Sequence, residues 1–254
     1  MKAVRVLACT LGLLLAGPGA AAPVRLASEE WPPYVTAALP EQGLSGAYAA
    51  AVYARLGTPV HIDYYPWKRT MELGLHDTRF AGFLAVWRTP EREKLCHFSA
   101  PIANTQNVLA YLREAPVRAA SLQSLRGLHL GIVAGYSNGE EFDSLVRAGV
   151  LDVQEGVNDE INLRKLLTRR FDAMVIERRV LRQLLSSGRY SKAERERIGT
   201  LEHLFHERTA HICFQRTPAG LAQQRAFNEA AREIDLPRFE RDYLRRIATD
   251  LGGN

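Results

Sequence analysis

The chain carries the stretch Arg88-Thr89-Pro90-Glu91-Arg92, which is followed by His97-Phe98-Ser99-Ala100-Pro101. Thr89 can cap a helix and Pro90 suits its first position, so the first stretch predicts a turn into a short helix. Arg92 then lies near a helix N-terminus, where the dipole favours negative charge. We therefore expect an anion beside Arg92, either a neighbouring glutamate or the carboxylate of a ligand.

Short apolar runs and helical patterns alternate on both sides of this stretch. Strands are expected at 24–28, 60–64, 80–86, 108–112, 130–134, 173–176 and 211–215. Helices are expected at 46–56, after Pro66, and at 122–125, 159–168, 180–185, 219–234 and 237–248. This alternation predicts an α/β fold with mostly parallel sheets. A polar change of composition at Glu114–Ala120 predicts a division into two lobes.

The N-terminal segment has the order of a secretory signal peptide. Lys2 and Arg5 precede the apolar run Val6–Leu15, and small residues follow at 17–22. The apolar run has about ten residues and is too short to span a bilayer. We predict a signal peptide over 1–22, with cleavage after Ala20 or Ala21, and hence a periplasmic protein. Cys9 comes too early in the run for a lipoprotein site.

Composition excludes some functions. The formal charge of +5 comes from basic residues that are scattered among acids, so no nucleic-acid partner is expected. Only Cys96 and Cys213 follow the predicted signal peptide. An oxidising exterior permits a disulfide between them, but two buried free thiols explain their apolar contexts equally well. Two cysteines without a nearby histidine pair give no metal site.

Three tryptophans stand near the predicted strand ends, where open α/β sheets bind ligands. Trp31 lies in a loop broken by two prolines, which favours a place in a cleft wall over the core. Trp67, at a helix start, fits core packing and pocket lining equally. Trp87 directly follows a strand and can stack on a ligand.

Polar residues occupy the same ends. Ser137 is expected to start a helix as its cap, and the N–H groups there could also hold a carboxylate. Glu177 ends a strand; it either pairs with Arg178 or Arg179 at the surface or receives a ligand ammonium group. Arg92 offers a forked match to a carboxylate. Together these residues describe a site for a zwitterion that requires no catalysis.

Eight short motifs resemble the bacterial extracellular solute-binding proteins of family 3, the polar amino acid type that serves ABC transporters. They are Trp-Pro-Pro-Tyr at 31–34, Leu-Ser-Gly at 44–46, Arg-Leu-Gly at 55–57, Thr-Pro-Glu-Arg at 89–92, Phe-Ser-Ala-Pro at 98–101, Leu-Arg-Gly at 125–127, Gly-Tyr-Ser at 135–137 and Phe-Asp-Ala at 171–173. The resemblance covers nearly all of residues 24–245. It implies the two-lobe fold of type 2 periplasmic binding proteins. Each lobe is then a mostly parallel sheet flanked by helices, with lobe 1 at 23–112 and 208–254 and lobe 2 at 113–207, joined by crossover strands near 108–112 and 211–215.

The resemblance also implies roles for single residues. Arg92 and Ser137 would hold the ligand carboxylate, Glu177 the α-amino group, and Trp31 would cover the ligand side chain. The candidate ligand-binding set is completed by Trp67, Trp87, Thr89 and Glu30; no catalytic residue, metal or cofactor is expected. Trp87, Ala85 and Ala81 replace polar residues usual in the family, and Pro66-Trp67-Lys68-Arg69 resembles a less characterised branch. These departures favour a larger or more aromatic ligand than a simple amino acid.

The implied function is that of a monomeric periplasmic protein that delivers a small carboxylate-bearing, amino-acid-like solute to the membrane permease of an ABC importer. One alternative is a ligand sensor that presents its closed form to a membrane receptor. Another is a cyclohexadienyl-dehydratase-like enzyme on the same fold, with Glu177 or Glu30 as general acid.

Overall fold

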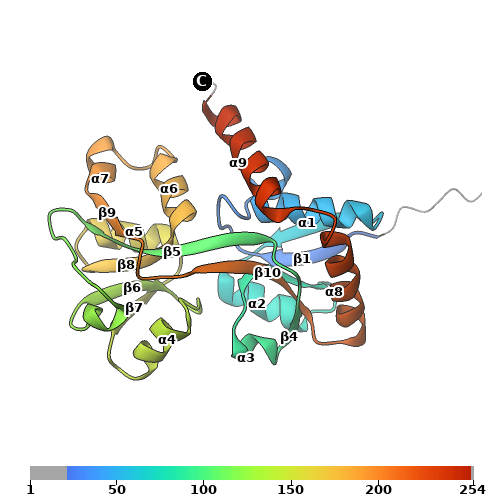
Figure 1. Ribbon diagram of the computed structural model, residues 1–254, viewed down its shortest axis with the longest axis horizontal. Helices are drawn as coiled ribbons and strands as arrows, with labels where there is room; N and C mark the ends of the chain where they lie inside the picture. Colours follow the sequence, from blue (N-terminus) through green and yellow to red (C-terminus); the bar gives the residue numbers. More distant parts are fainter. Residues whose placement is uncertain (1–21, 253–254) are drawn as a thin grey trace, which may run out of the picture.

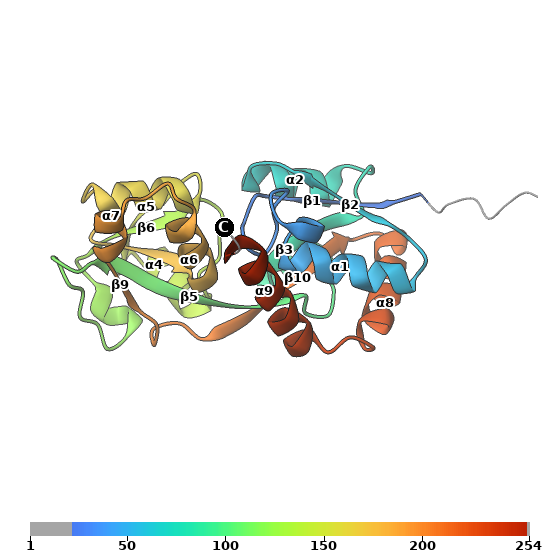
Figure 2. The same ribbon diagram turned by 90° about the horizontal axis from the view of Figure 1, so that it is seen from above.

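The computed structural model describes residues 22–252, so the predicted signal peptide, apart from Ala22, lies outside the described residues. Two lobes lie side by side, connected by two long strands (Figures 1 and 2). Lobe 1 contains β1 (Val24–Ser28), β2 (Val60–Tyr64), β3 (Gly82–Trp87), β4 (Cys96–Phe98), η1 (Pro40–Gln42), α1 (Leu44–Arg55), α2 (Trp67–His76), α3 (Pro90–Glu93), α8 (Pro218–Ala231) and α9 (Leu236–Gly252).

Lobe 2 is built in the same way from the middle of the chain. It contains β6 (His129–Val133), β7 (Asp152–Gly156), β8 (Ala173–Glu177), β9 (Ile198–Leu201), η2 (Leu122–Leu125), α4 (Glu140–Arg147), α5 (Asp159–Leu167), α6 (Arg178–Ser186) and α7 (Lys192–Glu196). All five residues of β8 are buried because helices cover both faces of the sheet there. Among the helices of residues 22–252, none combines the length and the apolar character that crossing a bilayer requires.

The connecting strands are β5 (Ala103–Leu112) and β10 (Glu207–Gln215). The sheet order β2-β1-β3-β10-β5-β8-β6-β7 places them in the middle of one continuous sheet. Pairs β1–β2, β1–β3, β6–β7 and β6–β8 are parallel, whereas β5 and β10 run antiparallel to their neighbours. The predicted α/β fold with two lobes and two crossover strands is therefore confirmed.

The crossover itself lies elsewhere than predicted. Residues 103–106 pair with 207–210 between the lobes. Residues 108–112 pair with β8 and β9 inside lobe 2, and 211–215 pair with β3 and β4 inside lobe 1. The apolar halves of both strands, which the sequence pattern detects, belong to the lobe cores. The crossing halves carry polar residues, which such a pattern misses.

The two cysteines form a disulfide, which decides between the alternatives that the sequence leaves open. The Cα atoms of Cys96 and Cys213 are 5.5 Å apart, and both residues are buried. The bridge joins β4 to β10 at a point where the two strands are paired. It lies in lobe 1 and closes a loop that contains all of lobe 2.

Candidate functional site

One turn of lobe 2, Gly135–Ser137, is held from the other side of the interlobe cleft. The Gly135 carbonyl accepts hydrogen bonds from Trp67 Nε1 and from Arg92 Nη2, each at 3.0 Å. The Ser137 carbonyl accepts one from Arg208 Nη1 at 2.9 Å, and the Tyr136 hydroxyl donates to Glu29 Oε1. Three of the predicted site residues, Trp67, Arg92 and Ser137, thus take part in a contact between the lobes.

Arg92 lies in α3, as the Thr-Pro-Glu-Arg stretch predicts. Thr89 caps this helix by accepting a hydrogen bond from the Arg92 amide at 3.2 Å. The Arg92 guanidinium donates to the carbonyls of Trp87 and Gly135 and lies 5.5 Å above the Trp67 ring. Burial lowers the pKa of Arg92, although nearby Asp143 opposes the shift. With two N–H groups used, the others can still bind a ligand anion.

Ser137 does not start a helix, so this part of the prediction is wrong. Helix α4 begins at Glu140 with Gly139 as its N-cap, because Gly139 adopts the positive φ of 108° that favours glycine. Ser137 Oγ and the Asn138 amide instead donate to the Asp143 carboxylate, at 2.7 and 2.9 Å. The donors that the sequence assigns to a ligand carboxylate thus serve Asp143 in this arrangement.

Glu177 lies at the predicted strand end but is surrounded by the chain's own donors. Its carboxylate accepts from the Tyr34 hydroxyl at 2.9 Å and from the backbone amides of Gln106, Arg179 and Val180 at 3.1, 2.6 and 2.9 Å. It is 3% exposed and caps α6, and burial raises its pKa. These four bonds fill its acceptor positions, so it has little capacity left for an ammonium group.

The three tryptophans form a connected aromatic group at the cleft. Trp31 stacks on Tyr34 at 4.5 Å and meets the edge of Trp87 at 5.4 Å. Trp67 and Trp87 both meet the Tyr136 ring edge-on, at 5.6 and 5.7 Å. One face of Trp87 is already covered by the Arg208 guanidinium at 4.8 Å. All three tryptophans are buried, so they shape the cleft as packed walls rather than as exposed rings.

Tyr136 lines two hollows of the cleft. The hollow on the Arg92 side has a volume of about 320 Å³ and is also lined by Thr89, Ser137 and Asp143. The hollow on the other side has a volume of about 690 Å³, and Trp31 and Glu30 line it. Glu30 is exposed and accepts a hydrogen bond from the Ala37 amide at 3.2 Å. The hollow on the Arg92 side contains Arg92 and Arg147 together with Glu91, Asp143 and Glu155. The other hollow contains Glu29, Glu30, Asp159 and Glu160 together with Arg189.

The larger hollow contains two carboxyl groups that sequence reasoning misses, Glu29 and Asp159. Burial raises the pKa of Glu29 to about 8 and that of Asp159 to about 7. Within residues 22–252, no cation lies within ion-pair distance of either group. The indole N–H of Trp31 makes no hydrogen bond of normal geometry, yet it is close enough to lower the pKa of Asp159 against the effect of burial. Their places at a strand end and at a helix start are the signals that could have identified them.

The raised pKa of Glu29 makes stability depend on pH. Because the folded state holds this proton between the ordinary pKa of 4.5 and about 8, it binds more protons than the unfolded state in that window. Stability is therefore expected to fall as pH rises through it. Between pH 5 and pH 8 the free energy of unfolding should fall by at least about 1 kcal/mol less in Glu29→Gln than in wild type, as measured by urea unfolding. Glu30→Gln, at the exposed neighbouring position, is the control. If the free energy of unfolding depends equally on pH in wild type and Glu29→Gln, the raised pKa of Glu29 is contradicted.

No model of a protein family matches the chain, and neither does the sequence of any curated protein. Solved structures match it over most of its length. An ancestral arginine-binding protein bound to arginine shares 16% identity with a TM-score of 0.72, covering 88% of this chain and 97% of that one. The GluR0 ligand-binding core from Nostoc punctiforme, in complex with L-glutamate, shares 19% identity with a TM-score of 0.68, covering 87% and 97%.

A third match is the precursor of an enzyme. An ancestral amino acid-binding protein that is a precursor of cyclohexadienyl dehydratase shares 13% identity with a TM-score of 0.67, covering 89% of this chain and 94% of that one. At these identities the likeness shows the fold. The chain has the two-lobe α/β fold of the type 2 periplasmic binding proteins, in agreement with the resemblance of its motifs.

Proposed function

We propose that this protein captures a small amino-acid-like solute between its lobes and delivers it, in the periplasm, to the membrane permease of an ABC importer. The observation that carries the proposal is the placement of Arg92 and of two buried acids, Glu29 and Asp159, in two hollows that Tyr136 lines in common. Arg92 lines the hollow on one side, and Glu29 and Asp159, which lack cation partners among the described residues, line the hollow on the other. A zwitterion matches this arrangement with its carboxylate toward Arg92 and its ammonium toward the two acids.

This proposal moves the ammonium site from Glu177 to Glu29 and Asp159. Glu177 is already saturated by four donors, whereas neither acid of the larger hollow forms an ion pair with a described residue. The aromatic rings of Trp31 and Tyr136 add faces that favour a cation. A ligand that uses both hollows would meet the Tyr136 side chain, which lines both and packs against Trp67 and Trp87.

Thermal-shift screening of the protein without its signal peptide tests the proposal. Each α-amino acid that raises the midpoint is compared with its amide, which lacks the carboxylate, and with its α-hydroxy acid, which lacks the ammonium group. We expect a clear rise only with the compound that has both groups, because each missing group leaves hydrogen-bonding groups of the cleft without a ligand partner. Equal shifts with all three compounds, or no shift with any amino acid, would contradict the proposal.

A second candidate function, a dehydratase-like reaction, is favoured by Glu29. A pKa of about 8 keeps this carboxyl protonated at neutral pH, as a general acid requires. Incubation with prephenate or arogenate distinguishes the two functions. Binding without catalysis predicts no product above the buffer rate, and turnover that disappears in Glu29→Gln would establish the enzyme instead.

A further inference from the structure

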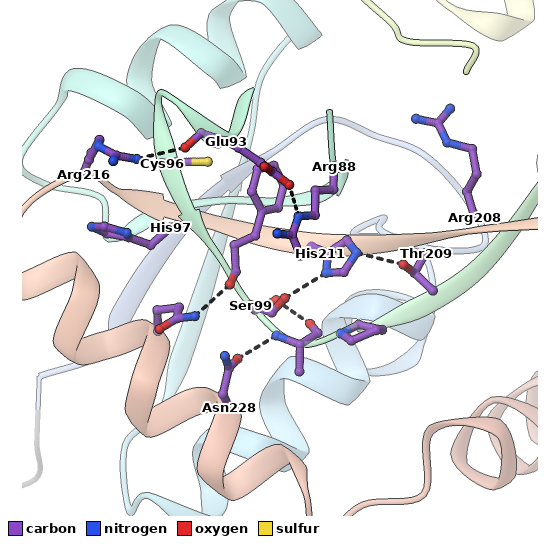
Figure 3. Close-up of a pocket in the computed structure, with 14 residues that line it drawn as sticks. Arg88, Glu93, Cys96, His97, Ser99, Arg208, Thr209, His211, Arg216 and Asn228 are labelled. Atoms are coloured by element: carbon purple, nitrogen blue, oxygen red, sulfur yellow. Dashed lines mark hydrogen bonds and ion pairs between the residues drawn. The ribbon is translucent and has the colours of Figure 1, made fainter. Parts of the chain in front are cut away.

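A third hollow lies on lobe 1, outside the interlobe cleft, and has a volume of about 840 Å³ (Figure 3). Its walls come from the β3–α3 turn, β4 and the turn after it, β10, and α8. Three arginines, Arg88, Arg208 and Arg216, line it together with a single carboxylate, Glu93. Three cationic side chains and one carboxylate give the lining a formal excess of two positive charges.

The arginines retain donors that the chain does not use. Arg88 Nε pairs with Glu93 Oε1, and Arg216 Nη1 donates to the Glu93 carbonyl at 2.9 Å. Within residues 22–252, the terminal N–H groups of Arg88 and the other N–H groups of Arg216 make no further hydrogen bond. Arg208 is engaged with Ser137 and Trp87, so it contributes positive charge rather than a donor.

The floor of the hollow is polar but carries no compensating charge. His211 is 5% exposed, and its Nδ1 lies 2.8 Å from the Ser99 carbonyl, which can only accept. Nδ1 therefore carries the proton, and Nε2 accepts from the Thr209 hydroxyl at 2.8 Å. Burial and nearby Arg88 lower the pKa of His211, so the ring is neutral at pH 7.

A further donor faces the hollow from α8. Asn228 Oδ1 accepts a hydrogen bond from the Ala100 amide at 2.6 Å, which orients the Nδ2 amine the other way. Figure 3 shows Arg88 directed toward His211 on the floor, with Arg216 and Asn228 on different sides of the hollow. Cationic and amide donors thus surround one space in which no carboxylate other than Glu93 is present.

We propose that this hollow binds a small multivalent anion, of the class of inorganic phosphate or a di- or tricarboxylate. Arg88 and Arg216 would form charge-assisted hydrogen bonds with it, and Asn228 Nδ2 would add a neutral one. The excess of two charges matches a divalent anion. Apart from Arg208, whose guanidinium donates to Ser137 of lobe 2, the lining lies outside the interlobe cleft, and the proposal does not depend on the solute proposed for that cleft.

Isothermal titration calorimetry with inorganic phosphate, and separately with citrate, tests the proposal at fixed ionic strength set with chloride. We expect saturable binding that Arg88→Gln/Arg216→Gln weakens by at least about tenfold. Arg225→Gln/Arg232→Gln removes the same charge from exposed positions in α8 and at its C-cap, and should bind as wild type does. The first double variant should also keep its affinity for the interlobe solute.

The two anions separate the possible ligands: stronger binding of phosphate assigns a phosphate-type ligand, and stronger binding of citrate a carboxylate-type one. The ring ¹⁵N shifts of His211 give a second readout, since an anion beside Arg88 should raise its pKa. Heat no greater than with chloride alone, or equal weakening in both double variants, would overturn the proposal by showing only diffuse attraction to a basic surface.

Discussion

Arg92→Ala should lower the affinity for the interlobe solute by at least about 100-fold, because a forked pair of charge-assisted hydrogen bonds is lost and each contributes about 1.5–3 kcal/mol. The same change removes the bond from Arg92 to the Gly135 carbonyl, which links the lobes. Calorimetry with the amino acid identified by thermal shift measures the effect. Arg92→Lys keeps the charge but not the forked guanidinium, so its affinity for the solute should lie between those of wild type and Arg92→Ala.

Loss of binding must be separated from loss of folding. Arg92→Ala should retain the wild-type circular dichroism spectrum, since α3 keeps its Thr89 cap and Pro90 start. Arg232→Ala, at the exposed C-cap of α8 with one surface ion pair, is the matched control and should bind normally. An affinity for Arg92→Ala within about threefold of wild type would refute the carboxylate role.

Cys96→Ala/Cys213→Ala should reduce the free energy of unfolding by about 4 kcal/mol. The bridge closes a loop of 117 residues, and the entropy that it removes from the unfolded chain grows with loop length. Urea unfolding of the oxidised protein and the double variant measures the difference. The double variant avoids the unpaired thiol that a single substitution would leave.

Reduced wild-type protein is the second comparison for this prediction. It should unfold at nearly the same urea concentration as the double variant, because both lack the covalent constraint. A difference below about 1 kcal/mol between oxidised and reduced protein would show that β4 and β10 are held by their pairing alone.

The sequence predicts best where local pattern and burial agree. Val24–Ser28, Val60–Tyr64 and the start of α3 match the structure since apolar runs and a Thr-Pro cap act locally. The strand Asp152–Gly156 escapes prediction because it is a polar edge strand with few buried side chains. Ser137, two residues after Gly135, resembles a helix cap in the sequence. In the structure Gly139 is the N-cap of α4, and Asp143 accepts a hydrogen bond from the Asn138 amide.

The chemistry of the cleft is less predictable because its partners are far apart in the chain. Tyr136 and Glu29 are 107 residues apart, and Tyr34 and Glu177 are 143 apart. A strand end indicates that a carboxylate is near the cleft, but not whether distant donors already occupy it. That difference separates Glu177, which is saturated, from Glu29 and Asp159, which lack a cation partner in the described part of the chain.

Native mass spectrometry of the protein purified from its own cells tests the proposed solute binding, since it identifies whatever the cleft retains. We expect one small molecule per chain with both a carboxylate and an amino group. It should be absent from Arg92→Ala prepared in the same way. A retained molecule without a carboxylate, or one that Arg92→Ala retains equally, would contradict it.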